Sequence, residues 1–312
     1  MILIVGATGY IGRRVLKILA EKNIPIRCLI RKPTIQKLDV LGLVKAENKN
    51  ISYVTGNALD YDSLLAATKG VKIVYYFIHH MDSSISGGGE RFDKLDRLAA
   101  ENMARACREN KVQRIIYLGA ICDPKEKLSL HLKSRKEVED IISKSGVDYT
   151  IFRASVIIGR GAAAFDLIDS MVKKIPIIPI IDSDATKVQP IFYKDVIKYL
   201  VDCLDKKATI NKSFDIGGKD VLSYEEIVRQ YAKELKIKRY YFRIKGNWRR
   251  LVAKGLSIIS PVNANVVYWL TESLRNTMVA NPDDAEKLKK IFGFEPRGFK
   301  ESIGKILNEI ST

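Results

Sequence analysis

Histidine and cysteine are scarce in this sequence, and neither occurs at the spacing of metal ligands. Its three histidines are His79, His80 and His131. The four cysteines lie far apart and form no CxxC pair, at Cys28, Cys107, Cys122 and Cys203. This distribution excludes a zinc finger or zinc ribbon, so no metal site is predicted. Isolated cysteines of this kind are typical of free thiols in a reducing compartment.

Long hydrophobic runs are also lacking. No apolar stretch reaches the roughly 20 residues that a membrane-spanning helix needs. The apolar run at the N-terminus is short, is interrupted by glycine and has no basic region before it, unlike a signal peptide. We therefore expect a cytoplasmic protein without a transmembrane segment.

Acidic residues are fewer than basic ones. The sequence has 36 Asp and Glu and 53 Lys and Arg, which gives a net charge of +17. An excess of this size attracts polyanions such as nucleotides, nucleic acids and anionic lipids. However, the charge is spread along the whole chain, and no motif that reads DNA or RNA accompanies it. We expect a lysine-rich solvated surface and no specific nucleic-acid partner.

Strand and helix periodicities alternate along most of the 312 residues. Strands are predicted at 2–5, 25–30, 51–54, 71–78, 114–118, 148–153, 188–192, 213–216 and 240–244. Helices are predicted from residue 10 and at 35–44, 63–68, 90–109, 128–144, 162–174, 193–204 and 224–235. This alternation predicts an α/β fold, a doubly wound parallel sheet of the Rossmann type with a smaller mixed C-terminal substrate lobe. The dinucleotide-binding domain is assigned to 1–158 and 186–219, and the lobe to 159–185 and 220–312.

The first twelve residues, MILIVGATGYIG, carry the clearest functional signal. A short β-branched strand stops at Gly6, and Gly9 and Gly12 follow at intervals of three before a helix pattern. Glycines at these places permit a tight turn, a close approach of backbone to phosphate, and close packing of helix on strand. The N–H groups and the dipole of the helix then face the anion, so the pattern predicts a pyrophosphate cradle. Its other contacts are predicted at Thr8, Tyr10 and Ile11.

The residues after the second strand discriminate between the two nicotinamide cofactors. An NAD site usually has Asp or Glu there, which binds the ribose diol. This sequence has Arg31 and Lys32 instead, and two cations suit the 2′-phosphate of NADP(H). NADP(H) is therefore the predicted cofactor, and NAD is the alternative. Further cofactor contacts are predicted after the third and fourth strands, at Asn57, Ala58, Leu59, Phe77 and His79.

Several segments together resemble the short-chain dehydrogenase/reductase superfamily, in its extended and atypical branches: GATGYIG, GNALDYDSL, QPIFYKDVIKYL and FDIGG. Three others are similar to the NmrA-like atypical group of NAD(P)-binding, epimerase-like proteins: YYFIHHM, LSLHLKSRKEVEDII and FRASVIIGRGAAAFDLI. The resemblance covers residues 1–235 well. It implies NAD(P) binding and an oxidoreductase or epimerase-like activity on a small or lipophilic substrate.

Catalytic members of that superfamily have a Tyr-xxx-Lys pair on the helix after the fifth strand and a Ser or Thr at the end of that strand. Here the helix register places His131 and Arg135 at the two positions, and the strand ends in Gly119 and Ala120. Side chains four residues apart lie on one helix face. In one interpretation His131 is the general acid/base and Arg135 binds the ribose and phosphate of the cofactor. In the other, the catalytic pair is lost and the domain only binds cofactor.

The resemblance also implies where the nicotinamide lies. Gly119 and the loop after the sixth strand, with Arg153, Ala154 and Ser155, are expected to pass it. His79 either reaches the same end of the site or is a strand-end histidine bonded to backbone. Asn102 is expected to tie its helix to the neighbouring strand, in a structural role.

Residues 238–275 mix cations with aromatic residues. Trp248, Leu251, Val252 and Leu256 fall on one face of a predicted helix. This segment is either a lid over an apolar pocket, with its cations extending outward, or a peripheral contact with an anionic membrane surface. As a lid, it predicts a hydrophobic or acidic small molecule as the ligand.

Three hypotheses for the function remain open. The first is an NADP(H)-dependent oxidoreductase or epimerase-like enzyme with an altered catalytic pair. The second is a nonenzymatic NADP(H)-binding regulator, sensor or assembly protein. A nucleic-acid or membrane partner bound through the positive charge is a third and weaker hypothesis, and no oligomeric state follows from the sequence.

Overall fold

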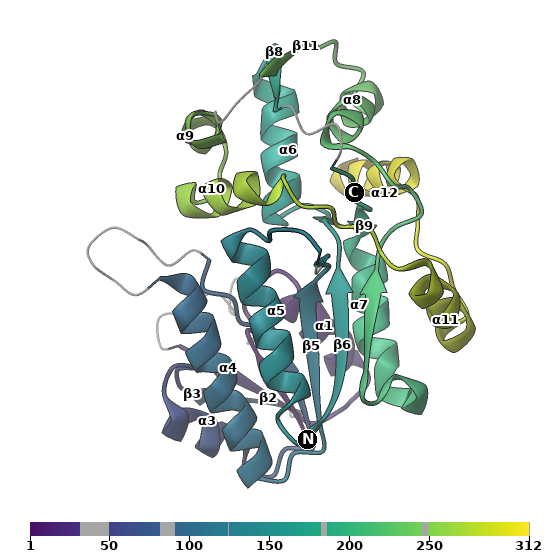
Figure 1. The fold of residues 1–312 in the computed structure, drawn as a ribbon. Helices are drawn as coiled ribbons and strands as arrows, with labels where there is room; N and C mark the ends of the chain where they lie inside the picture. Colours follow the sequence, from purple (N-terminus) through teal and green to yellow (C-terminus); the bar gives the residue numbers. More distant parts are fainter. Residues whose placement is uncertain (32–49, 82–90, 124, 182–185, 245–248, 312) are drawn as a thin grey trace.

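A seven-stranded parallel sheet forms the centre of the protein (Figure 1). The computed structural model describes residues 1–31, 50–81, 91–123, 125–181, 186–244 and 249–311, and the predicted helix at 35–44 lies outside them. The strand order is β10-β6-β5-β4-β1-β2-β3. The strands are β1 (Ile2–Val5), β2 (Ile26–Ile30), β3 (Ile51–Thr55), β4 (Ile73–Tyr76), β5 (Arg114–Ala120), β6 (Asp148–Ala154) and β10 (Lys212–Ile216). This arrangement confirms the predicted doubly wound sheet of the Rossmann type.

Two sets of helices cover the two faces of this sheet. They are α1 (Gly12–Glu21) and α7 (Tyr193–Asp202) on one face, and α3 (Tyr61–Thr68), α4 (Phe92–Glu109) and α5 (Leu130–Ser143) on the other. Ile2 and Ile4 of β1 pack toward the first set, whereas Leu3 and Val5 pack toward the second. Successive side chains of a strand point to opposite faces, so β1 is buried on both sides and carries only apolar residues.

A smaller lobe lies at the carboxyl ends of the strands, at the end of the molecule opposite the N-terminus (Figure 1). It contains α6 (Ala163–Lys174), β8 (Ile177–Ile181), α8 (Tyr224–Glu234), β11 (Tyr240–Ile244), α9 (Arg249–Ile259) and α10 (Ala264–Ser273). β8 and β11 form a separate parallel pair. The chain then returns toward β10 and α8 through α11 (Pro282–Phe292) and α12 (Phe299–Ser311).

Two predicted strands are markedly shorter than their apolar patterns suggested. Of residues 71–78, only Ile73–Tyr76 forms β4. Of residues 188–192, only β9 (Ile191–Phe192) is a strand, and it pairs with β7 (Ile157–Ile158) outside the main sheet. Val188 instead bridges Leu222 and Met278. Pro190 lies between these contacts and has no N–H to continue a ladder, which explains the interruption. The predicted division into 1–158 with 186–219 and 159–185 with 220–312 stays a prediction.

Candidate functional site

The glycine turn between β1 and α1 has the geometry of an anion cradle. Gly6 has a φ of +94°, which side-chain-bearing residues rarely adopt, and a Cβ on Gly12 would lie 2.1 Å from the Gly6 carbonyl oxygen. Gly9 is exposed at the tip of the turn and donates its N–H to the Gly6 carbonyl at 3.0 Å. The N-cap residue Ile11 makes no side-chain cap, and the first turn of α1 contains no acidic residue. Because helix N–H groups at this end lack intrahelical partners, the turn fits a pyrophosphate.

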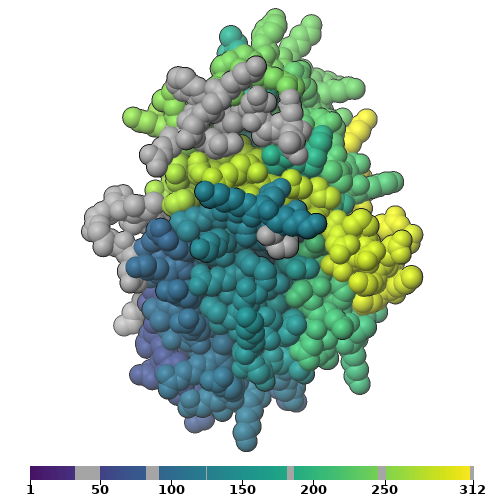
Figure 2. Space-filling view, viewed as in Figure 1, coloured from purple at the N-terminus to yellow at the C-terminus, as the bar shows by residue number. Residues whose placement is uncertain are grey.

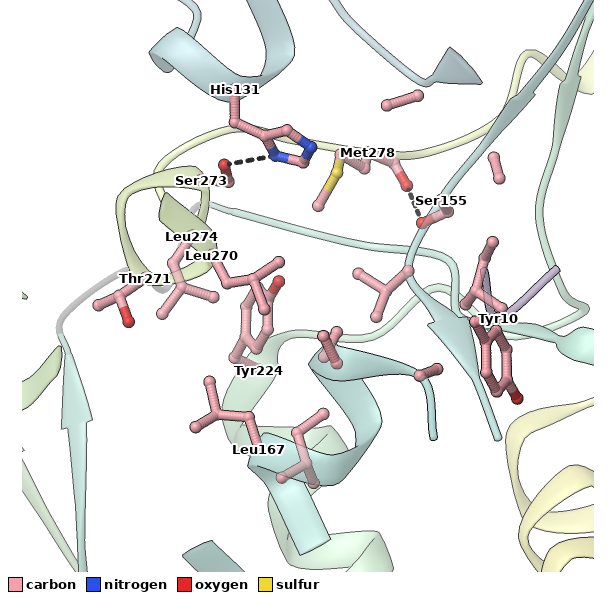
Figure 3. A pocket seen from close by; sticks show the side chains of 18 of the residues that line it. Tyr10, His131, Ser155, Leu167, Tyr224, Leu270, Thr271, Ser273, Leu274 and Met278 are labelled. Carbon is pink, nitrogen blue, oxygen red and sulfur yellow. Dashed lines mark hydrogen bonds between the residues drawn. The ribbon is translucent and has the colours of Figure 1, made fainter. Parts of the chain in front are cut away.

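A cavity of about 420 Å³ opens beside this turn. The predicted site residues that line it are Gly9, Tyr10, Ile11, Gly12, Phe77, His79, Gly119, His131, Arg135, Ala154 and Ser155. The lobe supplies the opposite wall, which includes Leu167, Met171, Val228, Val252, Leu256, Leu270 and Leu274. Figure 3 shows Tyr10 on one side of the cavity and Leu167, Leu270 and Leu274 on the other. Among the lining residues that the structure describes, Arg135 is the one Asp, Glu, Lys or Arg.

A buried carboxylate orients the histidine at the end of β4. Asp96 of α4 is 1% exposed and accepts hydrogen bonds from Nδ1 of His79 at 2.7 Å, Nδ1 of His80 at 2.9 Å and Oγ of Ser134 at 2.9 Å. Burial by itself raises the pKa of Asp96, but the bonds from His79 and His80 outweigh it and hold that pKa well below its usual range. The carboxylate is therefore ionised, and His79 donates its Nδ1–H and keeps its lone pair at Nε2. His79 thus bonds a side chain, and the alternative of a backbone bond was wrong.

His131, the second residue of α5, lies beside His79, and its imidazole contacts a serine of the lobe. Its Nδ1 lies 3.3 Å from Oγ of Ser273 in α10 (Figure 3). Ser273 donates its hydroxyl to the carbonyl of Trp269 at 2.9 Å, so it accepts from His131, whose lone pair lies at Nε2. Burial lowers the pKa of His131 well below its usual value, and the charges of His79 and Arg135 lower it further. His131 is therefore a neutral imidazole at neutral pH.

Arg135 lies one helical turn after His131, but its side chain points toward the carboxyl ends of the sheet strands. Its guanidinium donates to the carbonyls of Ile78, at 3.2 Å, and of Leu118. It also lies over the ring of Tyr117, 4.8 Å from the centroid. These contacts fix the guanidinium at the ends of β4 and β5, on the floor of the cavity. Its predicted contact with cofactor stays a prediction.

Other predicted cofactor residues lie away from this cavity. The side chain of Arg153 pairs with Asp215 at 2.6 Å and also lies near Glu139 and Asp284, so it does not line the cavity. Gly6, Thr8, Arg31, Asn57, Ala58 and Leu59 are not lining residues either, and Lys32 lies outside the described residues. Arg31 is exposed at the end of β2. Asn102 donates to the Leu59 carbonyl at 3.1 Å and so ties α4 to the loop after β3, a structural role as predicted.

Two side chains of the site were not predicted from the sequence, Asp96 and Ser273. Asp96 had a usable signal, because it falls on the apolar face of its helix with Phe92, Ala99 and Met103, where a carboxylate needs partners. Ser273 had none, since its bond to His131 joins residues 142 positions apart.

Two features are absent from the described ranges. No cluster of three or more His, Cys, Asp or Glu there can hold a metal ion. No helix in the same ranges is both long and apolar enough to cross a bilayer.

The fold, the glycine turn and the adjoining cavity define a dinucleotide-binding protein of the Rossmann class. Residues 6–170, more than half of the chain, match the profile of the NAD(P)H-binding family. The chain belongs to this family, which confirms the resemblance to NAD(P)-binding short-chain dehydrogenase/reductase proteins.

Two curated relatives are similar over about three quarters of the chain. Subunit 9 of the NADH dehydrogenase [ubiquinone] 1 alpha subcomplex from Arabidopsis thaliana is 23% identical over 74% of the chain. The chloroplastic divinyl chlorophyllide a 8-vinyl-reductase of the same plant is 25% identical over 70% of the chain. The matches span 59% and 53% of these relatives' own lengths.

Solved structures share the fold over nearly the full chain. An NADPH-dependent quinone oxidoreductase from Escherichia coli is 17% identical, with a TM-score of 0.72 and coverage of 99% of this chain and 100% of that one. A nucleoside-diphosphate-sugar epimerase from Staphylococcus aureus is 16% identical, with a TM-score of 0.73 and coverage of 97% and 99%.

Proposed function

We propose that the protein is an NADP(H)-dependent reductase of a small, uncharged and apolar substrate. The observation that carries this proposal is the cavity, which joins the glycine turn to a wall of aliphatic side chains from the lobe. In this proposal, the segments 1–158 and 186–219 bind the cofactor, and 159–185 with 220–312 bind the substrate.

Two cations after β2 support NADP(H) over NAD as the cofactor. Arg31 and Lys32 occupy the position where an acidic residue would bind the ribose diol of NAD. A guanidinium matches the geometry of a phosphate group, so Arg31 would bind the 2′-phosphate.

Both the charge and the polarity of the cavity favour an uncharged substrate. A nucleotide sugar carries a diphosphate that needs cations or backbone N–H groups on the substrate side. Among the described lining residues the only cation is Arg135, and its guanidinium is bonded to Ile78 and Leu118. Of the substrates named for the two fold neighbours, a quinone therefore suits this cavity better than a nucleotide sugar. The proposed substrate class is a quinone or an aromatic carbonyl compound.

Proton transfer is assigned to His131. The bound nicotinamide supplies the hydride, and reduction of a carbonyl also consumes one proton at the substrate oxygen. His131 lines the cavity, and its Nε2 carries the free lone pair. In the reducing direction Nε2 takes up a proton from solvent hydronium and passes it to that oxygen, while Ser273 keeps the ring oriented. This protonated form is scarce at neutral pH, because the pKa of His131 is lowered. Arg135 fixes the ends of β4 and β5 below the reacting atoms.

One set of contacts favours the nonenzymatic alternative. The guanidinium at the usual Lys position is bonded to backbone, and Gly119 and Ala120 offer no hydroxyl at the strand end. An NADP(H)-binding sensor or assembly protein would need the cradle but no proton donor.

The rate of NADPH oxidation at neutral pH, measured with a panel of substrates, distinguishes the reductase from the nonenzymatic alternative. Uncharged quinones and aromatic ketones should support turnover, whereas nucleotide sugars should neither react nor compete. Absence of turnover over the whole panel, together with tight NADPH binding, would favour the nonenzymatic alternative. Turnover of nucleotide sugars would refute the proposed substrate class.

A further inference from the structure

The end of the lobe carries an unusual combination of exposed apolar side chains. In α9, Leu251 is 60% exposed and Ile258 is 80% exposed. They are seven residues apart and share one helix face with Lys254, which is also exposed. The outer face of a helix in a globular protein is normally polar. This stripe of apolar, cationic and apolar side chains therefore requires an explanation other than packing.

A second exposed apolar face occurs on the β8–β11 pair. Tyr240 is 74% exposed, and Phe242 and Ile177 are also exposed. Tyr240 and Phe242 alternate along β11, and Ile177 is the register partner of Tyr240 in β8, so all three point to the same side of the pair. Figure 1 shows α9 and the β8–β11 pair at the same end of the molecule, and Figure 2 shows this end of the surface. Lys174 at the end of α6, the helix that precedes β8, donates to the Ile259 carbonyl at 2.6 Å and ties α6 to α9.

The charge of this segment is of one sign. The sequence contains no acidic residue between Glu234 and Glu272. The same stretch contains eight cations, namely Lys236, Lys238, Arg239, Lys245, Lys254, Arg243, Arg249 and Arg250. Among the described side chains, Lys238 is exposed two residues before Tyr240 and Lys254 is exposed between Leu251 and Ile258, whereas Arg243 pairs with Glu225 at 2.9 Å. Exposed cations beside exposed apolar side chains are complementary to an anionic lipid surface, where each cation adds about fivefold to binding.

We propose that α9 and the β8–β11 pair dock the protein on an anionic phospholipid bilayer. Leu251, Ile258 and Tyr240 enter the headgroup region, and Lys254 binds lipid phosphates. The opposite face of α9 carries Val252 and Leu256, which line the cavity, so the prediction that Leu251 shares a face with them was wrong. Docking therefore places the wall of the apolar cavity against the membrane. This inference concerns an interaction surface and does not depend on the reaction proposed above.

The test is cosedimentation of the full chain with phosphatidylcholine vesicles that contain or lack phosphatidylserine. We expect binding that requires phosphatidylserine and weakens at least about tenfold in a Leu251→Ser/Ile258→Ser variant, since two apolar anchors are removed. Lys254→Glu should weaken binding by more than about fivefold, because it replaces a cation with an anion. Leu98→Ser, at an exposed apolar site on α4, and Lys212→Glu, at an exposed cation of β10, are the matched controls.

Three outcomes would overturn the proposal. The first is no binding to phosphatidylserine vesicles. The second is binding that the α9 variants and the control variants reduce equally, because the net charge alone would then explain it. The third is a dimer in analytical ultracentrifugation that Leu251→Ser/Ile258→Ser disperses, because the surface would then bind a second copy. NADPH affinity and melting temperature, measured in parallel, verify that every variant is folded.

Discussion

His79 and His131 stack with their ring centroids 5.1 Å apart and their planes 20° apart. One follows β4 and the other lies in the first turn of α5, and both line the cavity beside the glycine turn. Asp96 and Ser273 accept from their Nδ1 atoms, so both rings have their lone pair at Nε2. Two imidazolium charges at this separation would repel each other, so the pair takes up one proton at a time.

Replacement of His131 by Ala tests its assignment to proton transfer. We expect kcat for NADPH-dependent reduction to fall about 10²- to 10⁴-fold, the usual effect of losing a general acid. The affinity for NADPH should stay unchanged, because the glycine turn remains intact. Lys133→Ala, an exposed position on the same helix, is the control. Equal kcat values for the two variants would show that His131 carries no proton.

Asp96→Asn should destabilise the fold. The amide removes the charge that two imidazoles and Ser134 share, and hydrogen bonds to charged groups contribute about 1.5–3 kcal/mol. We expect the free energy of unfolding, measured by urea titration, to fall by about 2–3 kcal/mol. Glu101→Gln, exposed on the same helix, should change it by less than about 0.5 kcal/mol. A loss no larger than that of the control would contradict the burial and bonding of Asp96.

The stability of the protein should decline as the pH falls below the usual pKa of histidine. Burial lowers the pKa of His131 in the folded state, whereas the unfolded chain titrates near the ordinary value of about 6.5. The unfolded state therefore binds this proton more readily than the folded state. The stabilisation of the fold that depends on a neutral His131 is complete above about pH 6.5 and is lost as the pH falls below that value. Thermal melts between about pH 7 and pH 5 should show a shallower decline for His131→Gln. An identical slope would contradict the depressed pKa.

Gly12→Ala tests the packing of the glycine turn. An added Cβ would lie 2.1 Å from the Gly6 carbonyl oxygen, so α1 must shift away from β1. We expect NADPH affinity to fall at least about tenfold and the melting temperature to drop. Gly304→Ala in α12, where a Cβ meets no atom within 4 Å, is the control and should leave both unchanged or raise stability. Unaltered NADPH affinity in Gly12→Ala would mean that the turn does not hold the pyrophosphate.

Much of the dinucleotide-binding fold was predictable because its signals are local. The apolar run Ile2–Val5 and the glycines at 6, 9 and 12 predicted β1, the turn and α1, and the structure has all three. Strand β8 was missed because Pro179 interrupts its apolar run, and its pairing with β11 could not be foreseen because the two strands lie far apart in the chain. For the same reason Ser273 could not be matched to His131. Arg153 was placed at the nicotinamide by resemblance, but its three carboxylate neighbours come from α5, β10 and α11, which only the tertiary structure brings together.

Replacement of Arg31 by Ala tests whether this residue makes the protein prefer NADPH over NADH. Loss of a charge-assisted bond to the 2′-phosphate should weaken NADPH binding about 10- to 100-fold. NADH binding should stay the same, because NADH lacks that phosphate. Lys212→Ala, a remote exposed cation, controls for the change in net charge. Equal losses for both cofactors would place Arg31 outside the 2′-phosphate site.

Titration of the purified protein with NADPH and NADH, followed by nucleotide fluorescence, tests the central claim most directly. The account predicts that NADPH binds in the micromolar range or tighter and at least about tenfold more tightly than NADH. Failure of both nucleotides to bind below about millimolar concentration would contradict it.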